Sequence, residues 1–187
     1  IVQYFKQELG NRGQVMATDC SELAPALYDA DKHFIVPRMD DDGYLDIILN
    51  ISKENKIKGV LSLIDPELSL LAENKEAFLK IGTTPIISDY DLVEMCFDKY
   101  KFYEFLIENG FKTIRSYVDK DLFYKDIDAG LIDYPVFVKP VRGSASINIS
   151  KVTTEEEIVL LFSRYDNLMI QVFMDGIEYG ADTYIDM

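Results

Sequence analysis

The chain has 187 residues, of which 48% are hydrophobic and 12% aromatic, so it can bury a core in one large domain or two small ones. Its 33 acidic and 19 basic residues give a formal net charge of -14, which argues against a broad surface for nucleic acid or anionic membranes. No apolar run reaches the roughly 20 residues of a membrane helix, and the first residues lack a secretory pattern. We therefore expect a cytoplasmic protein without nucleic-acid or membrane partners.

The first 88 residues alternate between helix and strand patterns. Apolar residues at helical spacing predict an opening helix that ends at Gly10 to Gly13. Strands are expected at 14–19, 33–37, 59–64 and 84–88, with helices at 44–56 and 66–81. This alternation predicts a doubly wound, mainly parallel sheet. Because a helix followed by a strand is the second half of a βαβ unit, we expect a first strand before Ile1.

The pattern changes after Ser88, and we place a domain boundary near Asp89. Two successive helices, a mixture of strands and helices, and two final strands predict a small α+β subdomain. Thr154 to Glu157 form a capping box that begins one of its helices. The expected helices are 89–95, 99–109, 122–130 and 154–165, and the expected strands are 116–118, 136–139, 147–152, 168–173 and 178–187.

The most informative stretch runs from Tyr134 to Asn148. Lys139 ends an apolar strand, so its ammonium group is expected to project from the end of the strand, where a cation can meet phosphate oxygens. The loop that follows has small residues, backbone amides and hydroxyls that suit phosphate binding. It is not a P-loop, because a strand follows it and Gly-Lys-Ser/Thr is absent. A β-hairpin with a polar tip and a lysine at its base is the alternative interpretation.

A second apolar strand from Ile170 leads through Met-Asp-Gly to Glu178 and Tyr179. With the first stretch, it makes a layout suited to holding phosphate at one end and ribose at the other. In this order, the two stretches resemble the ATP-grasp superfamily and, within it, the large chain of carbamoyl phosphate synthetase and its stand-alone relatives. Asp98-Lys99 at the start of a helix that closes at Gly110 to Thr113 supports the same resemblance.

The resemblance covers nearly the whole chain and implies its domain organisation. Residues 1–88 correspond to the α/β domain that precedes the ATP-grasp domain, without its first strand. Residues 89–187 correspond to part of the ATP-grasp domain, with linking helices at 89–112, the lid at 113–170 and the start of the large subdomain at 171–187. Since the family's magnesium ligands lie on strands beyond Met187, we expect this fragment to be inactive by itself.

The resemblance also implies the roles of individual residues. Lys99 and Lys139 match basic residues that reach the nucleotide phosphates, and the loop matches the flexible cover over them. The hinge matches the place where relatives hold adenine by main-chain groups, and Glu178 matches an acid that accepts hydrogen bonds from ribose. The loop spans residues 143–148, with Gly143, Ser144, Ala145 and Ser146 as its candidate binding residues, and the hinge residues are Gln171, Val172 and Phe173. Without the resemblance, Lys99 reads as an exposed first-turn lysine and Glu178 as a solvated strand-edge acid.

Three positions depart from the family pattern. Val172 stands where relatives usually have an acid, so a side-chain contact to the adenine amino group is expected to be lost. Ala145 and Asn148 stand where relatives often have glycine. Asparagine tolerates a positive φ, whereas alanine is expected to stiffen the loop and slow its motion.

The resemblance implies an ATP-dependent ligase in which a carboxylate or bicarbonate is phosphorylated to an acyl phosphate that an amine or ammonia attacks. Its cofactors are ATP and Mg²⁺, and no catalytic residue or metal ligand is assigned within this chain. A nucleotide-binding regulatory module without turnover is the first alternative. A dinucleotide-binding oxidoreductase is a weaker one, because Gly-x-Gly-x-x-Gly is absent. The oligomeric state stays open, with a homo-oligomer among the options.

Other polar residues are expected to have structural roles. Asp19 and Asp65 each follow a predicted strand, where they either line a substrate site or, as we favour, cap the next helix. His33 lies in an apolar run and is expected to be a packed or rim residue. The cysteines, Cys20 and Cys96, show no metal or disulfide spacing, so we expect free thiols that are buried or half-buried. The acidic runs at 40–42 and 155–157 are expected to be loop and helix-start charges.

Overall fold

The computed structural model describes residues 1–143 and 148–181. The chain folds into two compact units, Ile1–Tyr90 and Asp91–Met187. The division lies beside Asp89, where the sequence analysis places the domain boundary. Among the described residues, no helix is both long and apolar enough to cross a membrane.

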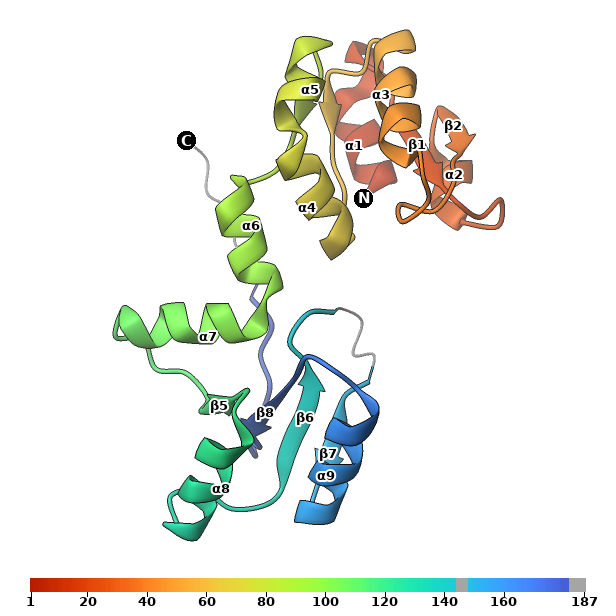
Figure 1. The fold of residues 1–187 in the computed structure, drawn as a ribbon. Helices are drawn as coiled ribbons and strands as arrows, with labels where there is room; N and C mark the ends of the chain where they lie inside the picture. The colour runs from red at the N-terminus through yellow and green to blue at the C-terminus, as the bar shows by residue number, and fades with distance from the viewer. Residues whose placement is uncertain (144–147, 182–187) are drawn as a thin grey trace. The chain divides into compact units, whose positions relative to one another are not determined.

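The first unit alternates helices with short parallel strands (Figure 1). Strand β1 pairs with β2 and β3 with β4, and both ladders are parallel. The predicted α/β class is confirmed, although the described strands form two separate ladders. In chain order the elements are α1 (Val2–Leu9), the 3-10 turn η1 (Gly10–Arg12), β1 (Met16–Asp19), α2 (Pro25–Asp29), β2 (Lys32–Ile35), α3 (Tyr44–Glu54), β3 (Gly59–Val60), α4 (Asp65–Glu73), α5 (Lys75–Lys80) and β4 (Thr84–Pro85).

Several elements of this unit differ from the prediction. Strands β3 and β4 end at Val60 and Pro85, before the predicted ends at 64 and 88. The single helix expected at 66–81 is broken at Asn74, whose side-chain amide donates to the Leu70 carbonyl at 2.9 Å and so competes with the helical backbone. Helix α2 was missed, although Pro25 at its first position is a helix-start signal. The core of the unit gathers side chains from the end of β2 and from α3, α4 and α5, namely Val36, Tyr44, Ile48, Leu71 and Phe78.

The second unit is built on one antiparallel sheet of four strands in the order β5-β8-β6-β7 (Figure 1). Its elements are α6 (Tyr90–Phe97), α7 (Lys99–Glu108), β5 (Ser116–Tyr117), α8 (Lys120–Asp128), β6 (Val136–Pro140), β7 (Ser150–Val152), α9 (Glu155–Arg164) and β8 (Leu168–Val172). Asp98 and Asp119 cap α7 and α8, and the predicted capping box of Thr154 and Glu157 begins α9.

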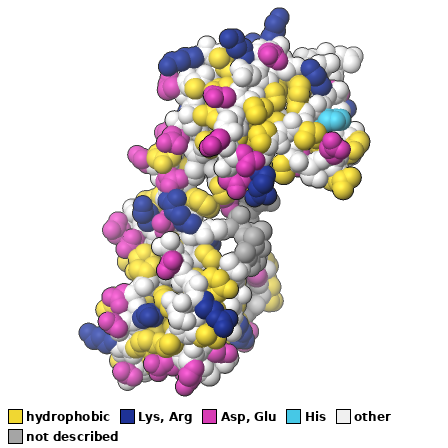
Figure 2. All heavy atoms as spheres, turned by 45° about the vertical axis from the view of Figure 1, so that its right-hand side comes forward, with side chains coloured by type: hydrophobic (Ala, Val, Ile, Leu, Met, Phe, Trp, Pro, Cys, Tyr) yellow, Lys and Arg dark blue, Asp and Glu magenta, His cyan; other side chains and the backbone are white. Residues whose placement is uncertain are grey.

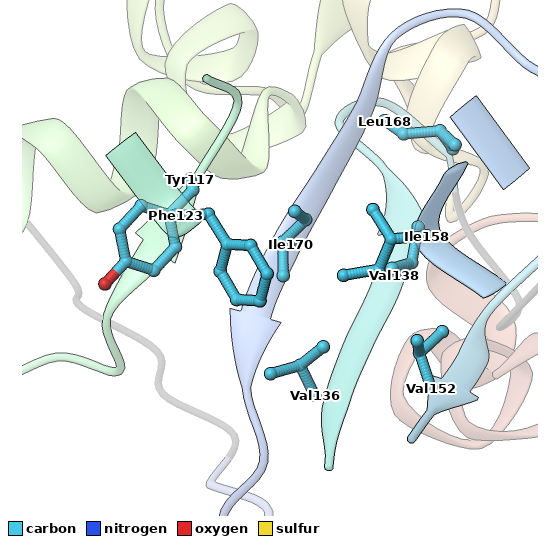
Figure 3. Packing of buried hydrophobic residues seen from close by; sticks show 8 residues of the cluster. All are labelled: Tyr117, Phe123, Val136, Val138, Val152, Ile158, Leu168 and Ile170. Carbon is cyan, nitrogen blue, oxygen red and sulfur yellow. The ribbon is translucent and has the colours of Figure 1, made fainter. Parts of the chain in front are cut away.

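Side chains from α8 and α9 pack against one face of this sheet, and Figure 3 shows the buried residues that meet there. Alternate residues of β6 and β8 point into this core together with Phe123 of α8 and Ile158 of α9, both of which are completely buried. The sheet residues of the core are Tyr117, Val136, Val138, Val152, Leu168 and Ile170. Because side chains alternate along a strand, residues 137, 139 and 171 must lie on the opposite face.

The last predicted strand is not present where the structure describes it. Residues 178–181 lie outside any strand, and 182–187 are outside the described residues. A strand needs a hydrogen-bonded neighbour, and among the described residues this segment has none.

Candidate nucleotide-binding site

The face of the sheet opposite the core carries a row of polar and aromatic side chains. Ser116 of β5 pairs with Gln171 of β8, Gln171 with Phe137 of β6, and Phe137 with Lys151 of β7. Direct cross-strand partners share a face, so the four side chains form one line across all four strands. Lys139 lies two residues beyond Phe137 and therefore on the same face.

Lys139 is half-buried, and its Nζ donates a hydrogen bond to Gln171 Oε1 at 2.7 Å. No carboxylate of the described residues lies within ion-pair distance of it. Burial lowers the pKa of Lys139, and the positive charge of Lys99 lowers it further. The site thus holds two neighbouring ammonium groups, and the described partner of the buried one is a neutral amide.

Lys99 is the first residue of α7, and it connects this helix to the segment that follows β6. Its backbone amide donates to the Val141 carbonyl at 3.0 Å, and its Nζ donates to the Gly143 carbonyl at 2.6 Å. Asp98 accepts hydrogen bonds from the amides of Tyr100 and Lys101 and so fixes the start of the helix. The structure therefore brings Lys99, Lys139 and Gly143 together, although sequence spacing alone did not require it.

Arg142 fastens the same segment to α6 and α7. Its guanidinium lies 2.6 Å from Glu94 Oε2 and 3.6 Å from Asp98 Oδ2, and its centre is 5.3 Å from the centre of the Phe97 ring. An isolated antiparallel bridge also joins Asp98 to Arg142. Sequence reasoning assigned no role to Arg142. We call this set of contacts, between Arg142 and Glu94, Phe97 and Asp98, the loop latch.

The loop itself is described only at its two ends. Gly143 has φ +142° and Asn148 has φ +58°, so a residue that tolerates positive φ stands at each end. The expected tolerance of Asn148 for this conformation is confirmed. Ser144, Ala145 and Ser146 lie outside the described residues.

The hinge residues were predicted to hold adenine by main-chain groups, but one of these groups is already hydrogen-bonded within the chain. The Val172 amide donates to the Arg115 carbonyl at 3.0 Å, so it is already engaged within the sheet. The Phe173 ring packs against Phe137 with ring centres 5.4 Å apart, and Lys151 Nζ lies 4.0 Å from the Phe173 ring centre. Phe137 was missed by sequence reasoning, although the period of two in β6 places it beside Lys139.

Glu178 lies in an irregular, exposed segment. It makes no hydrogen bond or ion pair with the part of the chain that the structure describes, so its role toward ribose stays a prediction.

The capping roles favoured for Asp19 and Asp65 are wrong. Asp19 accepts a hydrogen bond from the Ser21 amide at 2.8 Å in a local turn, and neither α2 nor α4 has a side-chain cap. Glu67 has the larger structural role, because it accepts hydrogen bonds from the hydroxyl groups of Tyr44 and Ser62. This network links α3 to α4 inside the first unit.

The remaining candidates for metal or nucleophilic chemistry lie at the surface. His33, Cys20 and Cys96 are exposed, which corrects the expectation that the thiols would be buried or half-buried. Figure 2 shows acidic, basic and hydrophobic side chains interspersed on the face in view. Within residues 1–143 and 148–181, no group of three or more His, Cys, Asp or Glu is placed to hold a metal ion.

The chain is similar to several known proteins. A family model for the N-terminal domain of PylC-like proteins matches residues 1–86. A D-alanine--D-alanine ligase from Christiangramia forsetii is 31% identical over 119 residues, which cover 58% of this chain and 36% of the ligase. The chain thus spans about a third of the length of the curated relatives that it matches.

Two solved structures share the fold over nearly the whole chain. The biotin carboxylase domain of 2-oxoglutarate carboxylase from Hydrogenobacter thermophilus has a TM-score of 0.65 and 22% identity, covering 93% of this chain and 41% of that one. An L-amino acid ligase from Bacillus licheniformis has a TM-score of 0.66 and 20% identity, covering 94% and 41%. The family model, the ligase relatives and the shared fold all point to the ATP-grasp superfamily.

Proposed function

We propose that the protein binds ATP on the polar face of the second unit's sheet and uses it to join a carboxylate, or bicarbonate, to an amine or ammonia through an acyl phosphate. The observation that carries the proposal is that Lys99 Nζ binds the Gly143 carbonyl at the start of the small-residue loop while its charge acts on Lys139, in the strand that leads into that loop. The described hydrogen-bond partner of Lys139 is an amide oxygen, so its charge is not neutralised there.

The electrostatics favour an anionic ligand. The charge of Lys99 and the burial of Lys139 both make the charged form of Lys139 less favourable in the protein alone. A triphosphate placed between the two ammonium groups would reverse this effect, because opposite charges stabilise one another in a partly desolvated site. In phosphoryl transfer, such fixed cations position the phosphates and offset the charge that develops on them.

The relatives support the same chemistry. They include D-alanine--D-alanine ligases and an L-amino acid ligase, and the biotin carboxylase structure is a complex with ADP, magnesium and bicarbonate. We carry the general reaction over to this protein and, within it, propose the carbamoyl-phosphate-synthetase-like route. In this proposal residues 113–170 act as the lid and the protein works in the cytoplasm.

Magnesium would accompany the nucleotide and neutralise part of its phosphate charge. The described residues hold no cluster of acidic ligands that fits a metal ion. We therefore assign no metal ligand to them and derive no step through the metal. The two lysines contribute positioning and charge.

Nucleotide binding is tested first. Calorimetric titration of the 187-residue chain with ATP should show one site, and Lys139→Met should weaken binding by about 10-fold to 100-fold, the size of a lost hydrogen bond to a charged group. Lys112→Met is the matched control, because Lys112 is an exposed lysine of the same unit. Equal affinity in the wild type and the Lys139 variant would refute this site.

Turnover is tested separately, by measuring ADP release from the full-length protein with bicarbonate, amino acids and small carboxylates, each with and without ammonia. Release that depends on a carboxylate supports the ligase. The alternative is a nucleotide-binding regulatory module without turnover. Tight ATP binding without ADP release under any of these conditions would favour that module.

A further inference from the structure

We propose that Ser116 is a positioning residue for Lys139, which it holds in place through the side-chain amide of Gln171. The three side chains come from three neighbouring strands, β5, β8 and β6. We call this chain of hydrogen bonds the amide relay. What Lys139 binds rests on the function proposed above, whereas the relay can be tested without any nucleotide.

The relay is continuous from the edge strand to the lysine. Ser116 Oγ donates to the Ile114 carbonyl at 3.0 Å, and Gln171 Nε2 donates to Ser116 Oγ at 3.0 Å. Gln171 Oε1 then accepts from Lys139 Nζ at 2.7 Å. Ser116 is only 3% exposed, so water has little access to replace its hydrogen bonds.

The Ile114 carbonyl at one end of the relay and the Lys139 ammonium group at the other fix the direction of each hydrogen bond between them. The Ile114 carbonyl can only accept, so the single hydroxyl proton of Ser116 must point toward it. The Ser116 oxygen then has to accept from Gln171, which turns the amide nitrogen toward β5. The amide oxygen is left facing Lys139, and an ammonium group can only donate. No other orientation of the amide satisfies both ends.

This arrangement gives Lys139 a fixed acceptor without cancelling its charge. A glutamate at position 171 would place a carboxylate against the ammonium group and form an ion pair there. It would also leave the Ser116 hydroxyl without a donor to accept from. The neutral amide therefore suits a lysine whose charge is used by an anionic ligand. Ser116 determines which end of that amide the lysine meets, although it does not touch the lysine itself.

The test is the titration of Lys139, followed by the ¹³Cε resonances of labelled lysine side chains in the 187-residue chain without nucleotide. Ser116→Ala releases the Gln171 amide, so the charged Lys139 loses its fixed acceptor. Burial and the charge of Lys99 remain. The pKa of Lys139 should therefore fall below its wild-type value. Gln171→Glu should raise it, because a carboxylate stabilises the ammonium form. Ser116→Thr keeps the hydroxyl and should restore wild-type behaviour.

Binding of inorganic tripolyphosphate is measured in parallel. Ser116→Ala should weaken it by about 3-fold to 10-fold, the size of one lost hydrogen bond, and Ser116→Thr should not. Lys112 gives a reference resonance in every variant. If Ser116→Ala unfolds the sheet, Gln171→Met cuts the relay at the next bond and should lower the pKa of Lys139 in the same way.

The outcomes separate the two proposals. A Lys139 titration that is unchanged in folded Ser116→Ala would overturn the positioning role of Ser116, even if ATP binds. If Ser116→Ala does not fold, an unchanged titration in folded Gln171→Met would overturn the relay. Absence of ATP and tripolyphosphate binding in the wild type would overturn the proposed function, while a shifted titration would still support the relay.

Discussion

The two faces of the four-stranded sheet carry different kinds of side chain, although their residues alternate along the same strands. Val136, Val138 and Ile170 are at most 1% exposed beneath α8 and α9. Their neighbours Phe137, Lys139 and Gln171 face the other way and carry the aromatic ring, the cation and the amide of the candidate site. A register shift of one residue would exchange the two sets, so the packed face also determines where the chemistry lies.

This comparison predicts that substitutions on the packed face change stability and that substitutions on the polar face change binding. The following variants test that separation, beginning with the largest expected effect.

Phe123→Ala should have the largest effect on stability. Its ring is completely buried and lies 5.5 Å from the Tyr117 ring and 5.3 Å from the Tyr124 ring. We expect a loss of about 3–5 kcal/mol in the free energy of unfolding, measured by urea denaturation of the chain. The adjacent Leu122 is 54% exposed, so Leu122→Ala should change stability by about 0.5 kcal/mol or less. Similar losses in the two variants would contradict the assignment of the packed face.

ATP affinity should fall at alkaline pH through Lys139. Because burial and Lys99 lower the pKa of Lys139, its charge is lost below the ordinary lysine pKa of 10.5, and the phosphates lose that attraction as pH rises. The effect at high pH should approach the loss of about 10-fold to 100-fold expected for Lys139→Met. Calorimetric titrations at a series of pH values measure it. A wild-type pH profile identical to that of Lys139→Met would show that Lys139 does not carry the effect.

Arg142→Ala should weaken the loop latch without unfolding the sheet. The guanidinium is 43% exposed, so solvent screens its ion pairs, and we expect a loss of about 1 kcal/mol in local stability. Hydrogen exchange of the amides of Lys99 and Tyr100 should speed up, while the amides of β6 stay protected. Arg38→Ala is the matched control, because its ion pair with Asp40 is exposed on both sides. Unchanged exchange at the start of α7 would show that the latch does not hold it.

Tyr117→Phe tests a hydrogen bond at the edge of the packed face. The Tyr117 hydroxyl donates to Asp126 at 2.7 Å, and its loss should cost about 1 kcal/mol. Burial, followed by the Asp126 contact, raises the pKa of Tyr117 from 10.0 to about 12. Since the unfolded chain ionises first, this stabilisation is complete below pH 10 and is lost as pH rises from 10 to about 12. The phenylalanine variant should lack that alkaline loss in urea denaturation, and an identical loss would assign it to another group.

Much of the local structure could be predicted from the sequence because local patterns determine it. The capping box at Thr154, the helix start at Asp98 and the apolar alternation of β6 each depend on residues a few positions apart. The same reasoning failed where a side chain competed with the backbone, as Asn74 does, and where a strand needed a partner that the pattern does not reveal, as at 178–181.

Some features of the candidate site could likewise be predicted from the sequence, and others could not. The sequence by itself determined that Lys139 ends a strand ahead of a small-residue loop and that Lys99 begins a helix, because these features depend on neighbours in the chain. Only the tertiary structure decided that Lys99 meets Gly143, that Arg142 is held by Glu94, and that Ser116 orients Gln171 toward Lys139. Those contacts join residues 32, 44, 48 and 55 positions apart. Strand order and register set the contacts among Ser116, Gln171 and Lys139, and tertiary packing of α6 and α7 sets the other two.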